Sequence, residues 1–589
     1  MKILRVLAVL ALVAMSLLPV GEMAARLLGF SGIPGSIVIV QHLTLWVAFL
    51  GAALAASSDR LLSMSANTLL PASWLPRARV FVFAVAAAVT LCLAWAGLQF
   101  VLAERGGGAR LTLGMPRWPA QAIMPVGFLL IAGFGIWKAG DSWKLRLAAA
   151  LGLLGPLVFM LAPANSGMMW AGVAIVVAAA LLGMPIFATL GGIALILYWH
   201  GGIPVATLPV DMYRLVVSPV LPSLPLFTFA GYLMAEGGAS QRLLRVYSAL
   251  FGWMPGGLVI TTAVVCAIFT WAGSGLTILS MGGLLLPMLI KGGYPEKFSI
   301  GLVNASGSLG LLFPPSLPVI LYGIYSKTSI EDLFIGGFVP GMVMMTLVCA
   351  WGVYQGYRHK AARASFSWRE AVGATWEAKW ELAIPTIVLV GLFGGFGTLT
   401  EAGAFAVVYA YFVECLVYRG FSPVRDLTRI AGECAIVIGG VLMIIGVAVG
   451  LTNYLVDAQA PALLVTWVQT HIHSKYAFLL LLNCILLLKG SFMDVFSAII
   501  ILVPILTPVA EGFGIHPVQL GVIFLSNLEL GYLTPPVGIN LCLSAYRFKK
   551  PMTSIYMATL PFYLILLLGV LLITYIPWLT MAPLARMGR

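Results

Sequence analysis

Residues 304–316 read NASGSLGLLFPPS, and residues 527–537 read NLELGYLTPPV. Each stretch is preceded by a Gly-Ser step, at Gly273-Ser274 and Gly490-Ser491, and by a proline thirteen residues after that serine. With one four-residue insertion, the double prolines, one glycine and two leucines of the copies coincide. Interrupted, small-residue helices at corresponding positions of two halves are the best sequence indication of a secondary transporter's binding site. The pattern therefore predicts a duplicated fold, with one broken helix and one hairpin in each half.

The composition requires a membrane environment. Of 589 residues, 61% are hydrophobic and 9% are charged, whereas soluble domains carry about 25% charged residues. Apolar stretches of ~20 residues, long enough to cross the hydrocarbon layer, recur along the chain. The alternating pattern typical of a membrane barrel is missing from the sequence. We therefore predict an all-α integral membrane protein with about fifteen crossing or half-crossing segments by this length criterion.

The positive charge follows the membrane topology. The formal net charge is +13, but Lys and Arg lie at the ends of apolar segments, without the basic stripe of a nucleic-acid-binding surface. Around the first four helices, eight cations fall on one side and four on the other, which favours a cytoplasmic N-terminus. Residues 1–20 resemble a signal peptide, but the apolar run continues nearly to Leu28 without a small-residue cleavage site. We therefore expect an uncleaved first helix.

The chain divides into a small and a large membrane unit. Residues 1–140 are predicted to hold four helices, at about 4–28, 36–57, 78–102 and 120–138. A joining helix is expected within residues 141–165, and residues 166–589 form the large unit. The hydrophilic stretch Tyr354–Glu381, which we interpret as a cytoplasmic linker, separates two repeats at about 166–353 and 382–589. An odd number of crossings in each repeat would insert the two with inverted topology.

The broken segments release polar groups that a continuous helix uses internally. Proline lacks an N–H and clashes with the preceding turn, so Pro314-Pro315 and Pro535-Pro536 unwind the helix and free carbonyl groups. Such backbone is tolerated at membrane depth only where protein, water or an ion satisfies it. Freed carbonyls with Ser, Thr and Asn oxygens form a hard, neutral shell suited to Na⁺. Helix N-termini that face the same cavity suit an anionic substrate, and Ser274-Gly275 fits the tip of a re-entrant hairpin.

Three of the carboxylates in apolar stretches of the large unit bear on its sites. Asp494 is a candidate cation ligand, with a structural ion pair to Lys489 as the alternative. Glu529 lies in the second broken segment, where the first copy has Ser308, and its role stays open. Glu401 begins an apolar run, where a carboxylate at a helix start needs no further function.

The sequence lacks the signatures of ATP-driven transport and of catalysis. It contains no Gly-x-x-x-x-Gly-Lys-Ser/Thr loop, no Ser/His/Asp arrangement and no paired-His metal pattern. Energy would then come from an ion gradient, and neither a cofactor nor an enzymatic activity is expected.

Several segments resemble the large membrane subunit of the TRAP (tripartite ATP-independent periplasmic) transporters. They are residues 225–234 (PLFTFAGYLM), 291–295 (KGGYP), 312–323 (LFPPSLPVILYG), 398–403 (TLTEAG) and 533–540 (LTPPVGIN). Residues 1–140 resemble the small four-helix subunit of the same family, mostly in topology. The chain thus resembles the fused form, with residues 145–162 as the joining helix.

The resemblance implies a multi-pass importer of the bacterial inner membrane. It would couple uptake of a small organic anion to Na⁺ and move the anion by an elevator motion of an inverted-repeat unit with two re-entrant hairpins. A soluble periplasmic binding protein would deliver the cargo. The four-helix unit would enlarge a static scaffold, so that one chain could work as a monomer.

The resemblance also implies the residues of the sites. The sodium-site residues would be Gly273, Ser274, Asn304, Ser306, Gly310, Pro314, Ser491, Asp494, Asn527, Gly531, Thr534 and Pro535. The substrate-site residues would be Ser316 and Asn540. Residues 271–277 read WAGSGLT, where a Ser-Gly-Ser-Ala type of run is expected, so the exact ligands of the first sodium site stay open.

Two other interpretations remain open. A stand-alone ion-coupled carrier of the same architecture would not need the four additional N-terminal helices. A channel would not need two duplicated broken hairpins, and a membrane-embedded enzyme would need a convergent catalytic cluster that the sequence does not show.

Overall fold

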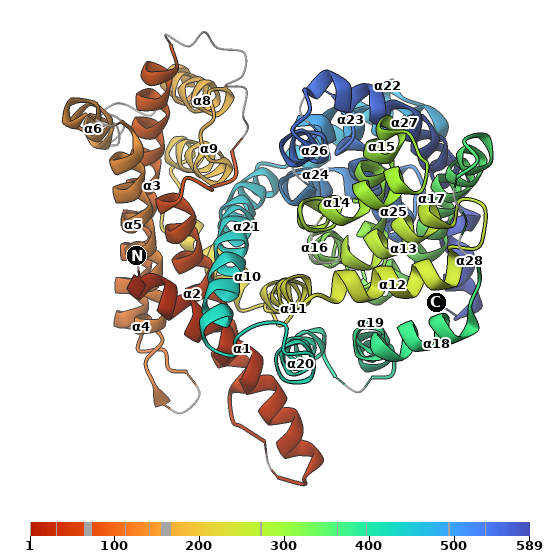
Figure 1. Cartoon of the computed structure of the whole chain (residues 1–589). Helices are drawn as coiled ribbons and strands as arrows, with labels where there is room; N and C mark the ends of the chain where they lie inside the picture. Colours follow the sequence, from red (N-terminus) through yellow and green to blue (C-terminus); the bar gives the residue numbers. More distant parts are fainter. Residues whose placement is uncertain are drawn as a thin grey trace. The chain divides into compact units, whose positions relative to one another are not determined.

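The computed structural model describes residues 2–30, 32–63, 74–111, 114–140, 142–154, 166–270, 274–361, 363, 365–395, 397–492, 495–535 and 538–588. Within these residues the chain is helical, with two isolated β-bridges and no strand (Figure 1). Eight of the described helices are long and apolar enough to cross a membrane, and five shorter apolar helices accompany them. The prediction of an all-α membrane protein is confirmed.

The chain forms two compact units. The first unit comprises Met1–Leu226, Leu399–Phe405 and Val424–Ala460, and the second comprises Phe227–Thr398, Ala406–Pro423 and Pro461–Arg589. The division falls inside two helices, α11 (Ser223–Gly237) and α20 (Leu399–Tyr411), so each of them contributes to both units. Both repeated motifs lie entirely in the second unit.

The first unit begins with the predicted four-helix segment. Its helices are α1 (Lys2–Leu27), α2 (Ser36–Ser57), α3 (Leu75–Gly107) and the consecutive pair α4 (Trp118–Gln121) and α5 (Ile123–Lys138). The unit continues with α6 (Trp143–Ala150), the 3-10 helix η3 (Leu151–Leu154), α8 (Ser166–Leu181), α9 (Ile186–His200), α10 (Thr207–Val216) and α21 (Arg425–Asp457). Residues 141 and 155–165 of the predicted joining helix lie outside the described residues.

Close helix packing and several ion pairs stabilise the first unit. A Cβ added at Gly439 of α21 would lie 2.5 Å from the Cα of Gly51 on α2, so the two backbones touch. Small residues permit this approach between membrane helices. Glu401 lies in the first turn of α20 and forms an ion pair with Arg26 of α1. A structural role at the start of a helix therefore accounts for this carboxylate.

The second unit holds two copies of one helical arrangement. The first copy comprises α13 (Gly257–Phe269), α14 (Ser274–Lys291), α15 (Glu296–Ser306), the 3-10 helix η5 (Leu309–Leu312), α16 (Leu317–Ser326) and α17 (Ile330–Arg358). The second copy comprises α23 (Lys475–Phe492), α24 (Val495–Gly512), α25 (Pro517–Gly531), α26 (Ile539–Phe548) and α27 (Met552–Tyr575). The other elements are α12 (Ala239–Phe251), α18 (Trp368–Glu377), α19 (Lys379–Phe393), the π-helix η6 (Phe412–Val417), α22 (Ala460–His471) and α28 (Trp578–Arg586).

The helix bounds correct the register predicted between the copies. α14 and α24 both have 18 residues, and each is followed by a glycine in the left-handed region, Gly293 with φ 89° and Gly514 with φ 67°. A gapless register therefore pairs Ser274 with Val495. The predicted four-residue insertion is wrong, because it pairs Ser274 with Ser491, which lies in the last turn of α23 instead of at the start of α24.

Candidate functional site

The first hairpin consists of α13 and α14, and its tip, residues 271–273, lies outside the described residues together with the predicted ligand Gly273. Ser274 is the first residue of α14 and is buried. At the end of α13, the hydroxyl of Thr270 lies 3.2 Å from the carbonyl oxygen of Gly307 and 2.6 Å from that of Cys266. The hairpin is thus joined to the broken helix through Thr270.

The first broken helix runs through α15 and η5 into α16. Its two parts, Glu296–Leu312 and Leu317–Ser326, are bent by 43° around Pro314-Pro315, as expected where two successive residues lack N–H groups. Ser306, at the end of α15, is 0% exposed, and its hydroxyl has no hydrogen-bond partner among the described residues. A buried polar group without a partner is costly, so this oxygen is suited to a ligand.

The second hairpin consists of α23 and α24. Its tip, residues 493–494, lies outside the described residues, and so does the predicted ligand Asp494. Ser491 is buried, its hydroxyl donates to the carbonyl of Leu488 at 2.7 Å, and its carbonyl accepts from the N–H of Gly538 at 3.2 Å. The N–H of Val495 donates to the hydroxyl of Tyr532 at 3.3 Å. Both arms of this hairpin are therefore hydrogen-bonded to the second broken segment.

The second broken helix runs from α25 to α26 through Thr534 and Pro535. The Thr534 hydroxyl donates to the carbonyl of Leu530 at 3.0 Å. Asn527 is 0% exposed, and its amide nitrogen lies 2.7 Å from Oδ1 of Asn483. The side-chain oxygen of Asn527 has no hydrogen-bond partner among the described residues. This oxygen is also suited to a ligand.

In each copy, one glycine of the broken helix allows its backbone to lie close against the first helix of the hairpin. A Cβ on Gly310 would clash with the carbonyl oxygen of Ala267 on α13, and a Cβ on Gly531 would lie 2.6 Å from the Cα of Gly490 on α23. Only glycine permits these approaches. The gapless register pairs Gly310 with Gly531, so the two contacts are structural equivalents.

The same register changes which candidate residues correspond. In this register Ser306 corresponds to Asn527, so the two buried oxygens without a hydrogen-bond partner among the described residues occupy equivalent positions in the two copies. Thr270 likewise corresponds to Ser491. Aligning the two copies by identical residues does not reveal this correspondence, because the two positions share a hydroxyl group but not the residue type. A gapless comparison that grouped the hydroxyl residues would have detected it.

Asn304 differs from Asn527 in its surroundings. Its amide nitrogen donates to the hydroxyl of Thr559 at 2.9 Å, and its oxygen accepts from the hydroxyl of Ser544 at 3.0 Å. Asn304 therefore connects α15 to α26 and α27, in addition to any ligand role.

The two predicted substrate residues lie at helix starts. Ser316 is the N-cap of α16 and is 1% exposed, and Asn540 lies in the first turn of α26 and is 0% exposed. Neither side chain has a hydrogen-bond partner among the described residues. Helix N-termini carry partial positive charge, so both positions suit an anionic group. Glu529 is buried as well, and both its oxygens lack partners within the same described range.

A buried ion cluster, which sequence analysis missed, joins α12, α19 and η6 of the second unit. Arg242 donates to Glu381 and, at 2.5 Å, to Glu414. Its guanidinium carbon lies 3.8 Å from the centre of the Tyr418 ring, and the Tyr418 hydroxyl donates to Glu381 at 3.0 Å. The side chains of Glu381 and Glu414 are 0% exposed. One cation therefore contacts two buried carboxyl groups that are distant from it in the sequence.

Comparison with known proteins gives matches to both parts of the chain. Residues 173–579 match the family "Tripartite ATP-independent periplasmic transporter, DctM component", and residues 15–144 match "Tripartite ATP-independent periplasmic transporters, DctQ component". The C4-dicarboxylate TRAP transporter large permease protein DctM of Vibrio cholerae is 30% identical over 442 residues, which cover 70% of this chain and 97% of that protein.

Two further relatives have other substrates in their names. The isethionate TRAP transporter permease protein DctMQ of Oleidesulfovibrio alaskensis is 34% identical over 408 residues, which cover 68% of this chain and 64% of that protein. The ectoine/5-hydroxyectoine TRAP transporter large permease protein UehC of Ruegeria pomeroyi is 31% identical over 351 residues, which cover 59% of this chain and 82% of that protein. Among solved structures, the YdaH transporter of Alcanivorax borkumensis aligns with 63% of this chain and 89% of its own, with a TM-score of 0.47 and 17% identity.

These matches identify a transporter of the bacterial inner membrane with multiple membrane crossings, and they exclude an enzyme. The resemblance inferred from the sequence motifs is confirmed. The chain belongs to the tripartite ATP-independent periplasmic transporter family and unites its DctQ and DctM components in one polypeptide.

Proposed function

We propose that this permease couples the entry of Na⁺ to the uptake of a small organic anion. The observation that carries the proposal is the pair of buried, unpartnered oxygens on Ser306 and Asn527. They occupy equivalent positions, and each lies one turn before a glycine that contacts the neighbouring hairpin. Neutral oxygens beside unwound backbone are the donors that Na⁺ takes in transporters with broken helices.

Each proposed sodium site combines a hairpin end with a broken helix. The first would use Ser274 and the stretch from Ser306 to Pro314, with Thr270 as an added candidate. The second would use Ser491, Asp494 and the stretch from Asn527 to Pro535. No other cofactor is proposed.

The cargo is proposed to be a small organic acid. Two of the named relatives transport C4-dicarboxylates and isethionate, which are carboxylate and sulfonate anions. Ser316 and Asn540 supply unpartnered polar groups at two helix starts, where the backbone N–H groups favour negative charge. We expect the second unit to carry the anion across the membrane in an elevator motion, and one chain to suffice as a monomer.

Dependence on a binding protein separates this proposal from a stand-alone carrier. The test is uptake of labelled C4-dicarboxylate and isethionate into proteoliposomes, with an inward Na⁺ gradient and with or without a purified binding protein of the family. We expect uptake only when both the gradient and the binding protein are present. Full uptake without the binding protein would establish the stand-alone carrier, and uptake without Na⁺ would reject the coupling ion.

Ser306→Ala tests the first sodium site. The substitution removes an oxygen that has no hydrogen-bond partner among the described residues, so the fold should keep its stability. We expect the Na⁺ concentration for half-maximal uptake to rise about tenfold, the effect of about 1.4 kcal/mol of lost binding. The matched control is Ser299→Ala, because Ser299 lies on the same helix outside the proposed site, and its hydroxyl already donates to the carbonyl of Pro295 at 3.0 Å. Equal sodium curves for the two variants would remove Ser306 from the site.

A further inference from the structure

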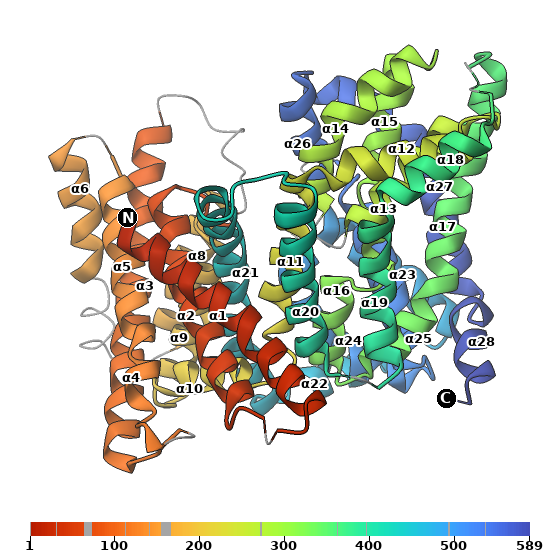
Figure 2. The same cartoon turned by 60° about the horizontal axis from the view of Figure 1, so that its bottom comes forward.

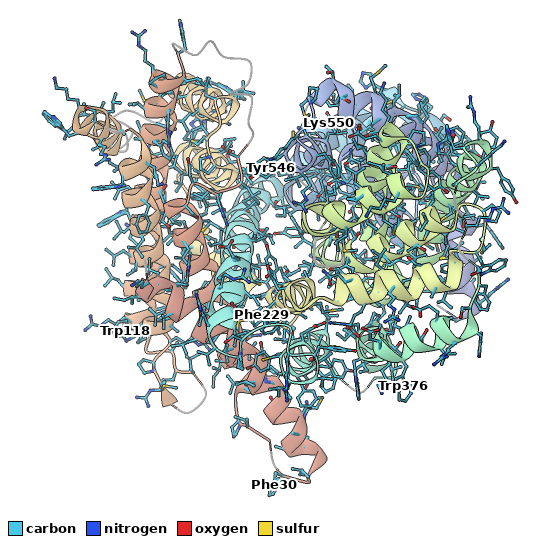
Figure 3. All side chains as sticks on the ribbon, in the orientation of Figure 1. Phe30, Trp118, Phe229, Trp376, Tyr546 and Lys550 are labelled. Carbon is cyan, nitrogen blue, oxygen red and sulfur yellow. The ribbon has the colours of Figure 1, made fainter. Side chains whose placement is uncertain are left out.

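The interval that the sequence describes as a hydrophilic linker contains α18, a helix with its large apolar side chains on the outside. Trp368, Val372 and Trp376 are spaced four residues apart and therefore share one face. They are 72%, 50% and 70% exposed, and Figure 3 shows Trp376 at the outer edge of the second unit. In water, an exposed row of this kind would be unfavourable.

The opposite face of α18 is small and firmly attached. Ala371 and Ala374 are buried, and the helix packs against α12. Arg245 of α12 pairs with Glu370 at 2.8 Å and also with Glu377. The hydrogen bond from Arg245 holds the pKa of Glu370 below its usual value, so this carboxylate stays ionised. These contacts fix which face of α18 points outward.

The outer face is accompanied by cations that these carboxylates do not neutralise. Five cations lie between residues 358 and 379, against two carboxylates that both face Arg245; the cations are Arg358, Lys360, Arg363, Arg369 and Lys379. The ammonium of Lys379 lies 3.5 Å from the centre of the Trp376 ring. Tryptophan beside lysine and arginine is typical of segments that lie at the headgroup level of a bilayer.

The direction of α18 agrees with such a position. Figure 1 looks almost along α19, whereas α12 and α18 are seen from the side. In Figure 2, α17 and α19 run lengthwise through the second unit, and α18 lies across the end of α19. α17 is apolar and long enough to cross a membrane, so a helix that crosses its neighbours at their ends lies near the membrane surface.

We propose that the outer face of α18 is a docking surface for anionic phospholipid at the surface of the surrounding bilayer. The row formed by Trp368, Val372 and Trp376 enters the interfacial layer, and the cations from Arg358 to Lys379 bind phosphate headgroups. The charge selects anionic over zwitterionic lipid, because cations beside a membrane surface are attracted by its negative potential. The two ion pairs of Arg245 transmit this attachment to α12.

The test uses the full-length protein in vesicles and isolates the emission of Trp376. Subtracting the fluorescence of Trp376→Phe from that of the wild type leaves the signal of this residue. The probes are phosphatidylcholine and phosphatidylglycerol with brominated acyl chains, each mixed at the same mole fraction into phosphatidylcholine vesicles. We expect quenching by both lipids, with stronger quenching by phosphatidylglycerol. An unquenched signal would mean that water, a second copy or a soluble protein covers the face, and it would overturn the proposal.

Charge variants test the preference for anionic lipid. In the triple variant Arg363→Gln, Arg369→Gln, Lys379→Gln, the Trp376 signal should show a much weaker preference for phosphatidylglycerol than in the wild type, since each cation near the surface contributes about a fivefold preference, or about 1 kcal/mol. The control Lys550→Gln removes a cation of the second unit that already pairs with Glu296 at 2.9 Å, so it should retain the preference. A preference in the triple variant as strong as that of the wild type would reject the proposed lipid selectivity.

Discussion

Replacing Arg242 with methionine should destabilise the protein by about 3–5 kcal/mol, the usual consequence of leaving a buried charge without its partner. The variant would remove the guanidinium that both Glu381 and Glu414 contact, and these two side chains are fully buried. It would also remove the cation that stacks on Tyr418. Thermal unfolding of the purified protein in detergent should show a clearly lower midpoint.

Arg245→Met is the matched control, because Arg245 lies on the same helix as Arg242, three residues later in the sequence. The side chain of Arg245 is 50% exposed, and the side chains of its partners Glu370 and Glu377 are 50% and 44% exposed. Exposed ion pairs contribute at most about 1 kcal/mol, so the midpoint should change little. In the Arg242→Met background, Glu414→Gln should restore part of the loss by removing one unpaired charge. Equal midpoints for the two arginine variants would contradict the assigned role of the cluster.

Gly531→Ala should abolish uptake even though it adds a single methyl group. The new Cβ would lie 2.6 Å from the Cα of Gly490, a backbone atom that cannot rotate away. α23 and α25 would have to separate, and forced overpacking of this kind costs about 1–3 kcal/mol. The separation would displace Asn527, which bonds to Asn483 across the same contact. We expect Na⁺-driven uptake at background level while the protein still inserts into the membrane.

Gly391→Ala is the control for the glycine substitution. Gly391 lies within α19, and a Cβ there would meet nothing within 4 Å. Alanine is more favourable than glycine inside a helix by about 1 kcal/mol, so uptake and stability should be retained or improved. Gly310→Ala should behave like Gly531→Ala, because it clashes with the carbonyl of Ala267 in the equivalent contact. Normal uptake in both repeat variants would mean that the hairpins do not need this close approach.

The comparison of the two copies shows where sequence reasoning succeeded and where it did not. Pro314-Pro315 could be predicted to break a helix, because proline acts on its own backbone and the preceding turn. The predicted equivalence of Ser274 and Ser491 was wrong. Both are serines after a glycine, but Ser274 begins the second helix of its hairpin, whereas Ser491 lies in the last turn of the first helix. Thr270 and Ser491 are the equivalent hydroxyl residues, and they share chemistry without sharing a letter. Gly273 and Asp494 lie outside the described residues, so their ligand roles remain predictions.

By itself, the sequence determined that this is a helical membrane transporter with two interrupted repeats, since apolar length, proline and glycine act locally on the chain. Only the tertiary structure decided which polar atoms are free. Asn304 and Asn527 are the same residue type in similar contexts, yet one amide oxygen accepts from Ser544 and the other has no partner among the described residues. Only folding brings Glu381 and Glu414 to one arginine. Hydrogen bonds of this kind depend on how each helix is rotated against distant helices, which no local pattern records.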